Sequence, residues 1–149
     1  MKKIALFPGS FNPFTQGHAN IVSRALNLFD GIIIAVGENS QKTASNLSQN
    51  KQKIQQLYQN DHRVKVVSYH CLTADLLQKE NATCIIRGIR NQADLAYEQE
   101  IAQANYSLFQ VETVFLLASP QLQEISSSLV RELEKYGKDI SQLLPQQPL

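Results

Sequence analysis

The stretch Pro8–His18, which reads PGSFNPFTQGH, decides how the rest of the chain is interpreted. It follows a short apolar run, Ile4–Phe7, and leads into an amphipathic segment that starts at about His18. Its two glycines and two prolines predict a loop with a defined shape, because glycine permits positive φ and proline fixes φ. A shaped loop that feeds the N-terminus of a helix is a natural binding site for phosphate.

The composition is that of a soluble globular protein. The chain has 149 residues, of which 43% are hydrophobic and 18% are charged, so we expect a single domain over residues 1–149, with residues 137–149 packing on it as a tail. A net charge of +1 gives no reason to expect nucleic acid or a membrane surface as a partner. No apolar run is long enough for a signal peptide or a membrane span, so the expected location is cytoplasmic. Cys71 and Cys84 are expected in or near the core.

Apolar, β-branched runs alternate with segments of helical periodicity along the chain. The first helix is expected over His18–Phe29, with Leu28 and Phe29 on its buried face together with Ile21, Val22 and Ala25. The predicted strands are Ile4–Phe7, Gly31–Val36, Val64–Ser68, Ala82–Ile86 and Thr113–Leu117. The other predicted helices are Gln49–Gln59, Thr73–Glu80, Gln92 to about Leu108, and Ser126–Tyr136.

Five strands alternating with five helices predict an α/β, Rossmann-like fold. We expect a doubly wound five-stranded parallel sheet with helices on both faces and strand order 3-2-1-4-5. In such sheets ligands bind beyond the carboxyl ends of the strands where the winding reverses. The loops expected to meet there are Pro8–Gly17 and Arg87–Asn91, the two with the most reactive side chains.

The chain lacks the usual nucleotide-binding and hydrolase motifs. It has no G-x-G-x-x-G after the first strand, no phosphate-binding G-x-x-x-x-G-K-[ST], no H-E-x-x-H and no G-x-S-x-G. What remains is a set of residues suited to phosphate: Ser10, His18, Lys42, Arg87, Arg90 and Ser126–Ser128. Because no nucleophile stands beside a general base, these residues are better suited to holding and neutralising phosphates than to attacking them.

Three sequence blocks resemble a known family. The stretch GSFNPFTQGH resembles the T/H-x-G-H signature of the nucleotidyltransferase superfamily. Together with RGIR at Arg87–Arg90 and ISSS at Ile125–Ser128, it resembles the bacterial phosphopantetheine adenylyltransferases over essentially the whole chain. Thr15 stands where the relatives that act on nicotinamide mononucleotide usually carry a first histidine.

The resemblance implies a late step of coenzyme A biosynthesis. AMP is transferred from ATP to 4′-phosphopantetheine, giving dephospho-CoA and pyrophosphate, with Mg²⁺ assisting. The acceptor phosphate attacks the α-phosphorus directly, so the protein contributes positioning and charge stabilisation. By analogy the protein is expected to be a homohexamer, with coenzyme A as a feedback ligand.

The resemblance also assigns roles to individual residues. His18, Lys42, Arg90 and Ser10 form the catalytic set, in which His18 stabilises the α-phosphate at the transition state. Arg87 is expected to hold the acceptor phosphate, and the substrate-binding set is Ser10, Lys42, Leu72, Thr73 and Arg87. The ATP-binding set is Ser10, Phe11, His18, Gly88, Ile89, Arg90, Glu98, Leu122, Gln123, Glu124, Ile125, Ser126, Ser127 and Ser128. No protein residue is expected to bind a metal.

Other features leave the interpretation open. Asp94 and Glu98 share a helix face, and Asp94 is expected only to orient an arginine. The segment after Lys42, TASNLSQNK, departs from the family pattern, and Leu122 replaces a frequent aromatic residue. Two alternatives remain at this stage: a nucleotidyltransferase with another acceptor, such as nicotinamide mononucleotide or an alcohol phosphate, and a non-enzymatic sensor of adenine nucleotides.

Overall fold

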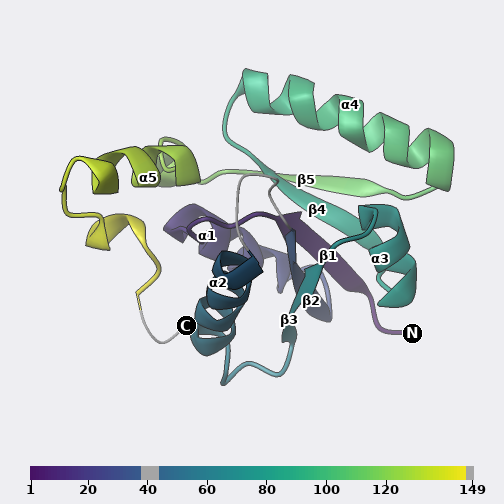
Figure 1. Ribbon diagram of the computed structural model, residues 1–149. Helices are drawn as coiled ribbons and strands as arrows, with labels where there is room; N and C mark the ends of the chain where they lie inside the picture. Colours follow the sequence, from purple (N-terminus) through teal and green to yellow (C-terminus); the bar gives the residue numbers. More distant parts are fainter. Residues whose placement is uncertain (38–43, 147–149) are drawn as a thin grey trace.

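A five-stranded parallel sheet forms the centre of the molecule (Figure 1). The computed structural model describes residues 1–37 and 44–146. The strands are β1 (Ile4–Gly9), β2 (Gly31–Gly37), β3 (Val64–Tyr69), β4 (Cys84–Ile89) and β5 (Thr113–Leu117). Their order, β3-β2-β1-β4-β5, confirms the predicted fold class. The winding therefore reverses between β1 and β4, which pair through Ala5 with Cys84 and Leu6 with Ile85.

Helices cover both faces of the sheet (Figure 1). They are α1 (Gln16–Ala25), α2 (Ala44–Leu57), α3 (Thr73–Lys79), α4 (Gln92–Phe109) and α5 (Ser127–Lys135), with short 3-10 turns at Pro120–Leu122 and Ser141–Leu143. Alternate strand residues point to opposite faces, so they build two cores. One contains Phe7, Val22 and Ile54 from β1, α1 and α2. The other contains Leu6 and Leu76, from β1 and α3.

Helix α4 is unusual because its only buried residue is a charged one, Glu98. Tyr97, Ile101 and Leu108 are 64%, 42% and 69% exposed, respectively. Their spacing of four and seven residues places them on one side of the helix. In Figure 1 the helix runs along the top of the molecule, above β4 and β5.

Several element boundaries differ from the predicted ones. Helix α1 begins at Gln16, two residues early, because Thr15 caps it, and it ends at Ala25. The expectation that Leu28 lies on the buried helix face is wrong, since Leu28 follows the helix and is 61% exposed. Helix α2 spans Ala44–Leu57 and therefore begins before the predicted start at Gln49.

Strand β4 also runs further than expected. It continues to Ile89 because β5 extends alongside it, pairing Arg87 with Phe115 and Ile89 with Leu117. Arg87 and Gly88 are therefore strand residues, not loop residues as predicted. A strand fixes the direction of the Arg87 side chain more firmly than a loop would.

The two cysteines differ in their surroundings. Cys84 is buried in the core, as expected, whereas Cys71 is exposed, so the prediction for Cys71 is wrong. Cys71 lies in the connection between β3 and α3, where the backbone runs over the surface. No helix in the described ranges is long and apolar enough to cross a membrane.

Ile54 tests the packing of α2 on the sheet. Its side chain is fully buried in the core that contains Phe7 and Val22. We expect Ile54→Ala to lower the free energy of unfolding by about 3 kcal/mol, because it removes buried methyl groups and leaves a cavity. Urea denaturation measures the change, with Leu28→Ala as the exposed control. A loss no larger than that of the control would show that α2 is not anchored by Ile54.

Candidate active site

The loop between β1 and α1 is held in a bent conformation by contacts from distant segments. Phe11 has a φ of 47°, which is unfavourable for a side chain of this size. The amide nitrogen of Asn50 in α2 donates to the carbonyl oxygen of Ser10 at 2.8 Å and also to that of Phe11. A Cβ at position 9 would lie 2.9 Å from the Phe11 ring, so a larger residue there would force this buried ring to shift.

His18 is fixed in one orientation and one tautomer by the start of α1. The backbone N–H of Thr15 donates to Nδ1 of His18 at 3.0 Å. In return the Thr15 hydroxyl accepts the N–H of His18 at 3.4 Å, so the two residues form a reciprocal helix cap. Since Nδ1 accepts a hydrogen bond, the neutral ring carries its proton on Nε2.

The surroundings of His18 keep its imidazole neutral. Its ring centroid lies 6.2 Å, 5.0 Å and 5.4 Å from those of Phe7, Phe11 and Phe14. Burial is the largest cause that lowers the pKa of His18 to about 3, and Arg87 and Arg90 add to it. Desolvation outweighs the effect of the two arginine charges on this pKa.

Each of the two candidate phosphate-binding arginines is paired with a carboxylate from α4. Arg87 donates from Nε and Nη2 to Glu98 at 2.9 Å and 2.7 Å, and from Nη1 to the carbonyl of Pro8. Arg90 donates from Nε and Nη2 to Asp94 at 2.9 Å and 3.2 Å. Asp94 thus contacts an arginine, as expected of a residue that orients one. These four side chains carry no net charge between them.

Burial raises the pKa of Asp94, but its hydrogen bonds with the Arg90 side chain and backbone outweigh this. The net result is a pKa below the usual range of an aspartic acid. Asp94 therefore remains ionised near neutral pH and keeps Arg90 in place.

The three serines at the start of α5 have different functions. Ser126 is the N-cap, and its hydroxyl accepts the N–H of Leu129 at 3.1 Å. The Ser127 hydroxyl donates to the carbonyl of Pro13 at 2.7 Å, and the Ser128 hydroxyl accepts from Arg131 at 3.2 Å. The three hydroxyls thus make contacts within the protein, and in the first turn of α5 the backbone N–H groups of Ser127 and Ser128 are the ones suited to an anion.

Two cavities meet at the carboxyl ends of β1 and β4. The His18 cavity, of about 370 Å³, is lined by His18, Arg90, Ser126–Ser128 and Arg131, among others. The Tyr69 cavity, of about 270 Å³, lies beside it and is lined by Tyr69, Thr73, Ile101, Asn105 and Thr113, among others. Both are bordered by Gly9, Ser10, Arg87, Tyr97 and Glu98. Two adjoining cavities with shared walls suit a reaction between two bound molecules.

Most of the predicted site residues line one of these cavities. Ser10, Phe11, His18, Arg87, Gly88, Arg90, Glu98, Leu122, Ile125 and Ser126–Ser128 line the His18 cavity, and Thr73 lines the Tyr69 cavity. Ile89 is buried, and Gln123 and Glu124 are exposed. The Leu72 side chain is 59% exposed, and none of these four lines either cavity. Lys42 lies outside the described residues.

Sequence reasoning missed four residues of the site. Asn50 and Arg131 hold the 10–13 loop from α2 and α5, and Arg131 donates to the carbonyl of Asn12 at 2.7 Å. Tyr69 contacts Thr73 with a hydroxyl-to-hydroxyl distance of 3.1 Å, and Tyr97 borders both cavities. No motif marks any of these residues, because each reaches the site from a different element of the fold.

The described residues contain no group of three or more His, Cys, Asp or Glu that could hold a metal ion. The carboxylates nearest the His18 cavity, Asp94 and Glu98, are each engaged by an arginine.

Comparison with known proteins agrees with this geometry. The family model described as cytidylyltransferase-like matches residues 6–133. The phosphopantetheine adenylyltransferase of Bacteroides thetaiotaomicron is 46% identical over 143 residues, which cover 95% of each chain. That of Cytophaga hutchinsonii is 46% identical over 147 residues, which cover 97% of this chain and 98% of the relative.

A solved structure shares the fold at low sequence identity. The bifunctional NMN adenylyltransferase/ADP ribose pyrophosphatase of Francisella tularensis, complexed with AMP and a manganese ion, matches with a TM-score of 0.70 and 18% identity. The match covers 99% of this chain and 45% of that one.

The lowered pKa of His18 makes a prediction about stability. As the pH falls below about 6.5, the unfolded chain binds a proton at His18, whereas the folded protein does so only near pH 3. The free energy of unfolding should therefore decrease on acidification. Between about pH 7.5 and pH 5, we expect wild type to lose about 2 kcal/mol relative to His18→Asn. Urea denaturation at both pH values measures this, and equal losses in the two proteins would show that His18 titrates normally.

Proposed function

This chain belongs to the cytidylyltransferase-like family and, within it, to the phosphopantetheine adenylyltransferases, and we propose that it transfers AMP from ATP to 4′-phosphopantetheine. The products are dephospho-CoA and pyrophosphate, which places the protein late in coenzyme A biosynthesis. The observation that carries the proposal is the pair of cavities joined at Ser10 and Arg87, with His18 and Arg90 together in one of them. Each substrate then has its own cavity, and the reacting groups meet at the shared wall.

In the proposed complex the triphosphate lies in the His18 cavity. Nε2–H of His18 donates to the α-phosphate, and Arg90 and the N–H groups at the start of α5 bind the β- and γ-phosphates. Because the His18 ring is neutral and fixed by Thr15, it can donate without first losing or gaining a proton. Leu122 packs against the nucleoside where an aromatic residue is frequent in relatives.

The acceptor lies in the Tyr69 cavity with its phosphate at Ser10 and Arg87. An oxygen of that phosphate forms the new bond to the α-phosphorus, and the bond from the α-phosphorus to the bridging oxygen breaks on the opposite side. Pyrophosphate leaves, and no proton needs to move. The protein holds both phosphates in line, which is the main contribution in this class of reaction.

The remaining ligands are proposed with the same activity. Mg²⁺ would bind with ATP and neutralise part of the triphosphate charge, since the described carboxylates of the site are paired. Lys42 would bridge the two reacting phosphates. Coenzyme A, which contains the product, would compete for both cavities as a feedback ligand. The cytoplasm is the compartment where we expect this step.

The exposed apolar side of α4 supports self-association, and we propose a homohexamer. Tyr97, Ile101 and Leu108 are exposed on one side of a helix whose only buried residue is Glu98. An apolar surface of this kind is typical of an interface. A second copy of the chain packing there would remove it from water.

The activity is tested by pyrophosphate release from Mg-ATP. We expect release with 4′-phosphopantetheine and none with nicotinamide mononucleotide or a simple alcohol phosphate. Release with one of those acceptors only would favour another nucleotidyltransferase of this superfamily. ATP binding without release under any condition would favour an adenine-nucleotide sensor.

His18→Ala tests the role of the imidazole. We expect kcat to fall by at least about a hundredfold, equivalent to about 3 kcal/mol, because one oriented donor to the transition state is lost. The KM for ATP should change far less, and the circular dichroism spectrum should stay that of wild type. His62→Ala is the matched control, since His62 lies outside both cavities. Turnover of His18→Ala near that of wild type would contradict the mechanism.

Leu108→Asp tests the proposed assembly. A carboxylate in the centre of an apolar interface is costly, so we expect dissociation to smaller species in sedimentation experiments at micromolar concentration. Leu28→Asp makes the same change at a comparably exposed site outside α4 and should leave the assembly intact. If both variants sediment as wild type does, α4 is not the interface.

A further inference from the structure

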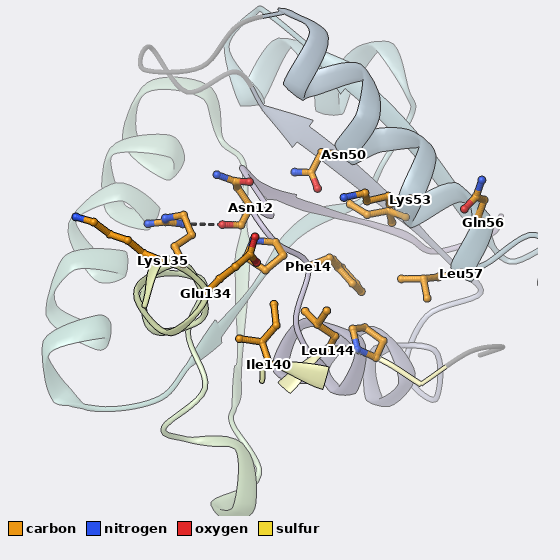
Figure 2. A pocket seen from close by; sticks show the side chains of 14 residues that line it. Asn12, Phe14, Asn50, Lys53, Gln56, Leu57, Glu134, Lys135, Ile140 and Leu144 are labelled. Carbon is orange, nitrogen blue, oxygen red and sulfur yellow. Dashed lines mark hydrogen bonds between the residues drawn. The ribbon is translucent and has the colours of Figure 1, made fainter. Parts of the chain in front are cut away.

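We propose that the groove between α2, α5 and the C-terminal segment is a second ligand site, for a small anion with an apolar ring system. This groove, the α2–tail groove, encloses about 650 Å³, compared with about 370 Å³ for the His18 cavity and about 270 Å³ for the Tyr69 cavity. Figure 2 shows Asn50, Lys53 and Leu57 on the α2 side, Ile140 and Leu144 on the tail side, and Phe14 between them.

Seven of the fourteen residues that line the α2–tail groove are apolar. Phe14 and Leu57 are 5% and 7% exposed and form its base, and Ile140, Leu144 and Pro145 form the opposite side. A flat apolar body inserted between Phe14 and Leu144 would lose contact with water on both faces. Such burial contributes roughly 25 cal/mol for each Å² of apolar surface, so the apolar part of a ligand supplies the larger share of the affinity.

The rim of the groove selects for negative charge. Lys53, Arg131 and Lys135 border it, against one carboxylate, Glu134, which leaves two positive charges in excess. None of these four groups forms an ion pair with any residue in the described ranges. Lys135 lies over the Tyr136 ring at 5.8 Å, whereas Lys53 extends toward the groove in Figure 2. A single carboxylate, sulfonate or phosphate beside Lys53 would therefore gain an uncontested partner.

The groove shares structural elements with the His18 cavity. Arg131 lines both, and it links them by donating to the carbonyl of Asn12 and to the hydroxyl of Ser128. Asn50, also on the groove wall, donates to the carbonyl of Ser10. A ligand that contacts Arg131 or Asn50 therefore acts on the loop that carries Ser10. This coupling rests on the proposed activity, but binding in the groove does not.

Anilinonaphthalene sulfonate has the proposed chemistry, namely a fused ring system with one sulfonate, and its fluorescence reports apolar binding. The chain contains no tryptophan, so no indole emission overlaps the signal. We expect Lys53→Glu to weaken probe binding by about tenfold, since it replaces an attraction with a repulsion. Lys51→Glu, on the same helix but outside the groove, should leave binding unchanged. Equal effects of the two variants would overturn the proposal.

A second pair of variants tests the apolar wall. Leu144→Ser should weaken probe binding, whereas Leu143→Ser, its neighbour outside the groove, should not. Saturating Mg-ATP should leave probe bound, since the nucleotide is assigned to the His18 cavity. Complete displacement by Mg-ATP would show that the probe occupies that cavity, and would overturn the second site.

Coupling is measured separately, by the KM for ATP in the presence of the probe. We expect a change of about fivefold in wild type and none in Lys53→Glu. If probe binding depends on Lys53 but the KM for ATP does not change, the proposed coupling is wrong and the proposed second site still stands. If no acceptor supports turnover but probe binding still depends on Lys53, the proposed activity fails and the second site stands.

Discussion

The reciprocal cap between Thr15 and His18 is the contact on which the site depends. A histidine at the edge of a cavity could carry its proton on either nitrogen, or on both. Here the backbone N–H of Thr15 occupies Nδ1, so only Nε2–H is available to a ligand. Three phenylalanine rings then make the charged form unfavourable. The same hydrogen bonds cap the N-terminus of α1. Formation of this helix therefore also fixes the orientation and the tautomer of the His18 ring.

Two of the arginines that line the His18 cavity are balanced by carboxylates without a ligand. Arg87 and Arg90 are neutralised by Glu98 and Asp94, which satisfies the arginines in the folded protein and fixes their positions. A triphosphate therefore cannot be held by excess charge on these arginines alone. In the proposed complex it binds to directed donors: Nε2–H of His18, the N–H groups at the start of α5, and the arginine N–H groups that the carboxylates leave unused. Directed donors favour one placement of the phosphates over others, which is what an in-line reaction needs.

The fold and much of the site could be predicted from local patterns, because alternating strands and helices leave few topologies and bring two polar loops to one edge. The errors in element bounds came from one contact between distant segments and from one local helix cap. Strand β4 reaches Ile89 because β5 runs beside it. Helix α1 starts at Gln16 because Thr15 is its N-cap. In the sequence, Thr15 stands out only as part of a motif. Asn50 and Arg131 belong to no motif, since what they bind is backbone carbonyl oxygen.

Helix α4 connects the site to the outer surface of the molecule. Its only buried residue, Glu98, is the one that holds Arg87, while Tyr97 and Ile101 border the Tyr69 cavity and are also exposed. A helix with so little buried apolar area is weakly anchored by its own chain. Packing against a second copy would hold α4 in place and cover the side chains at the cavity border. The ion pair that positions Arg87 would then depend on assembly, because the position of the Glu98 carboxylate is set by the position of α4.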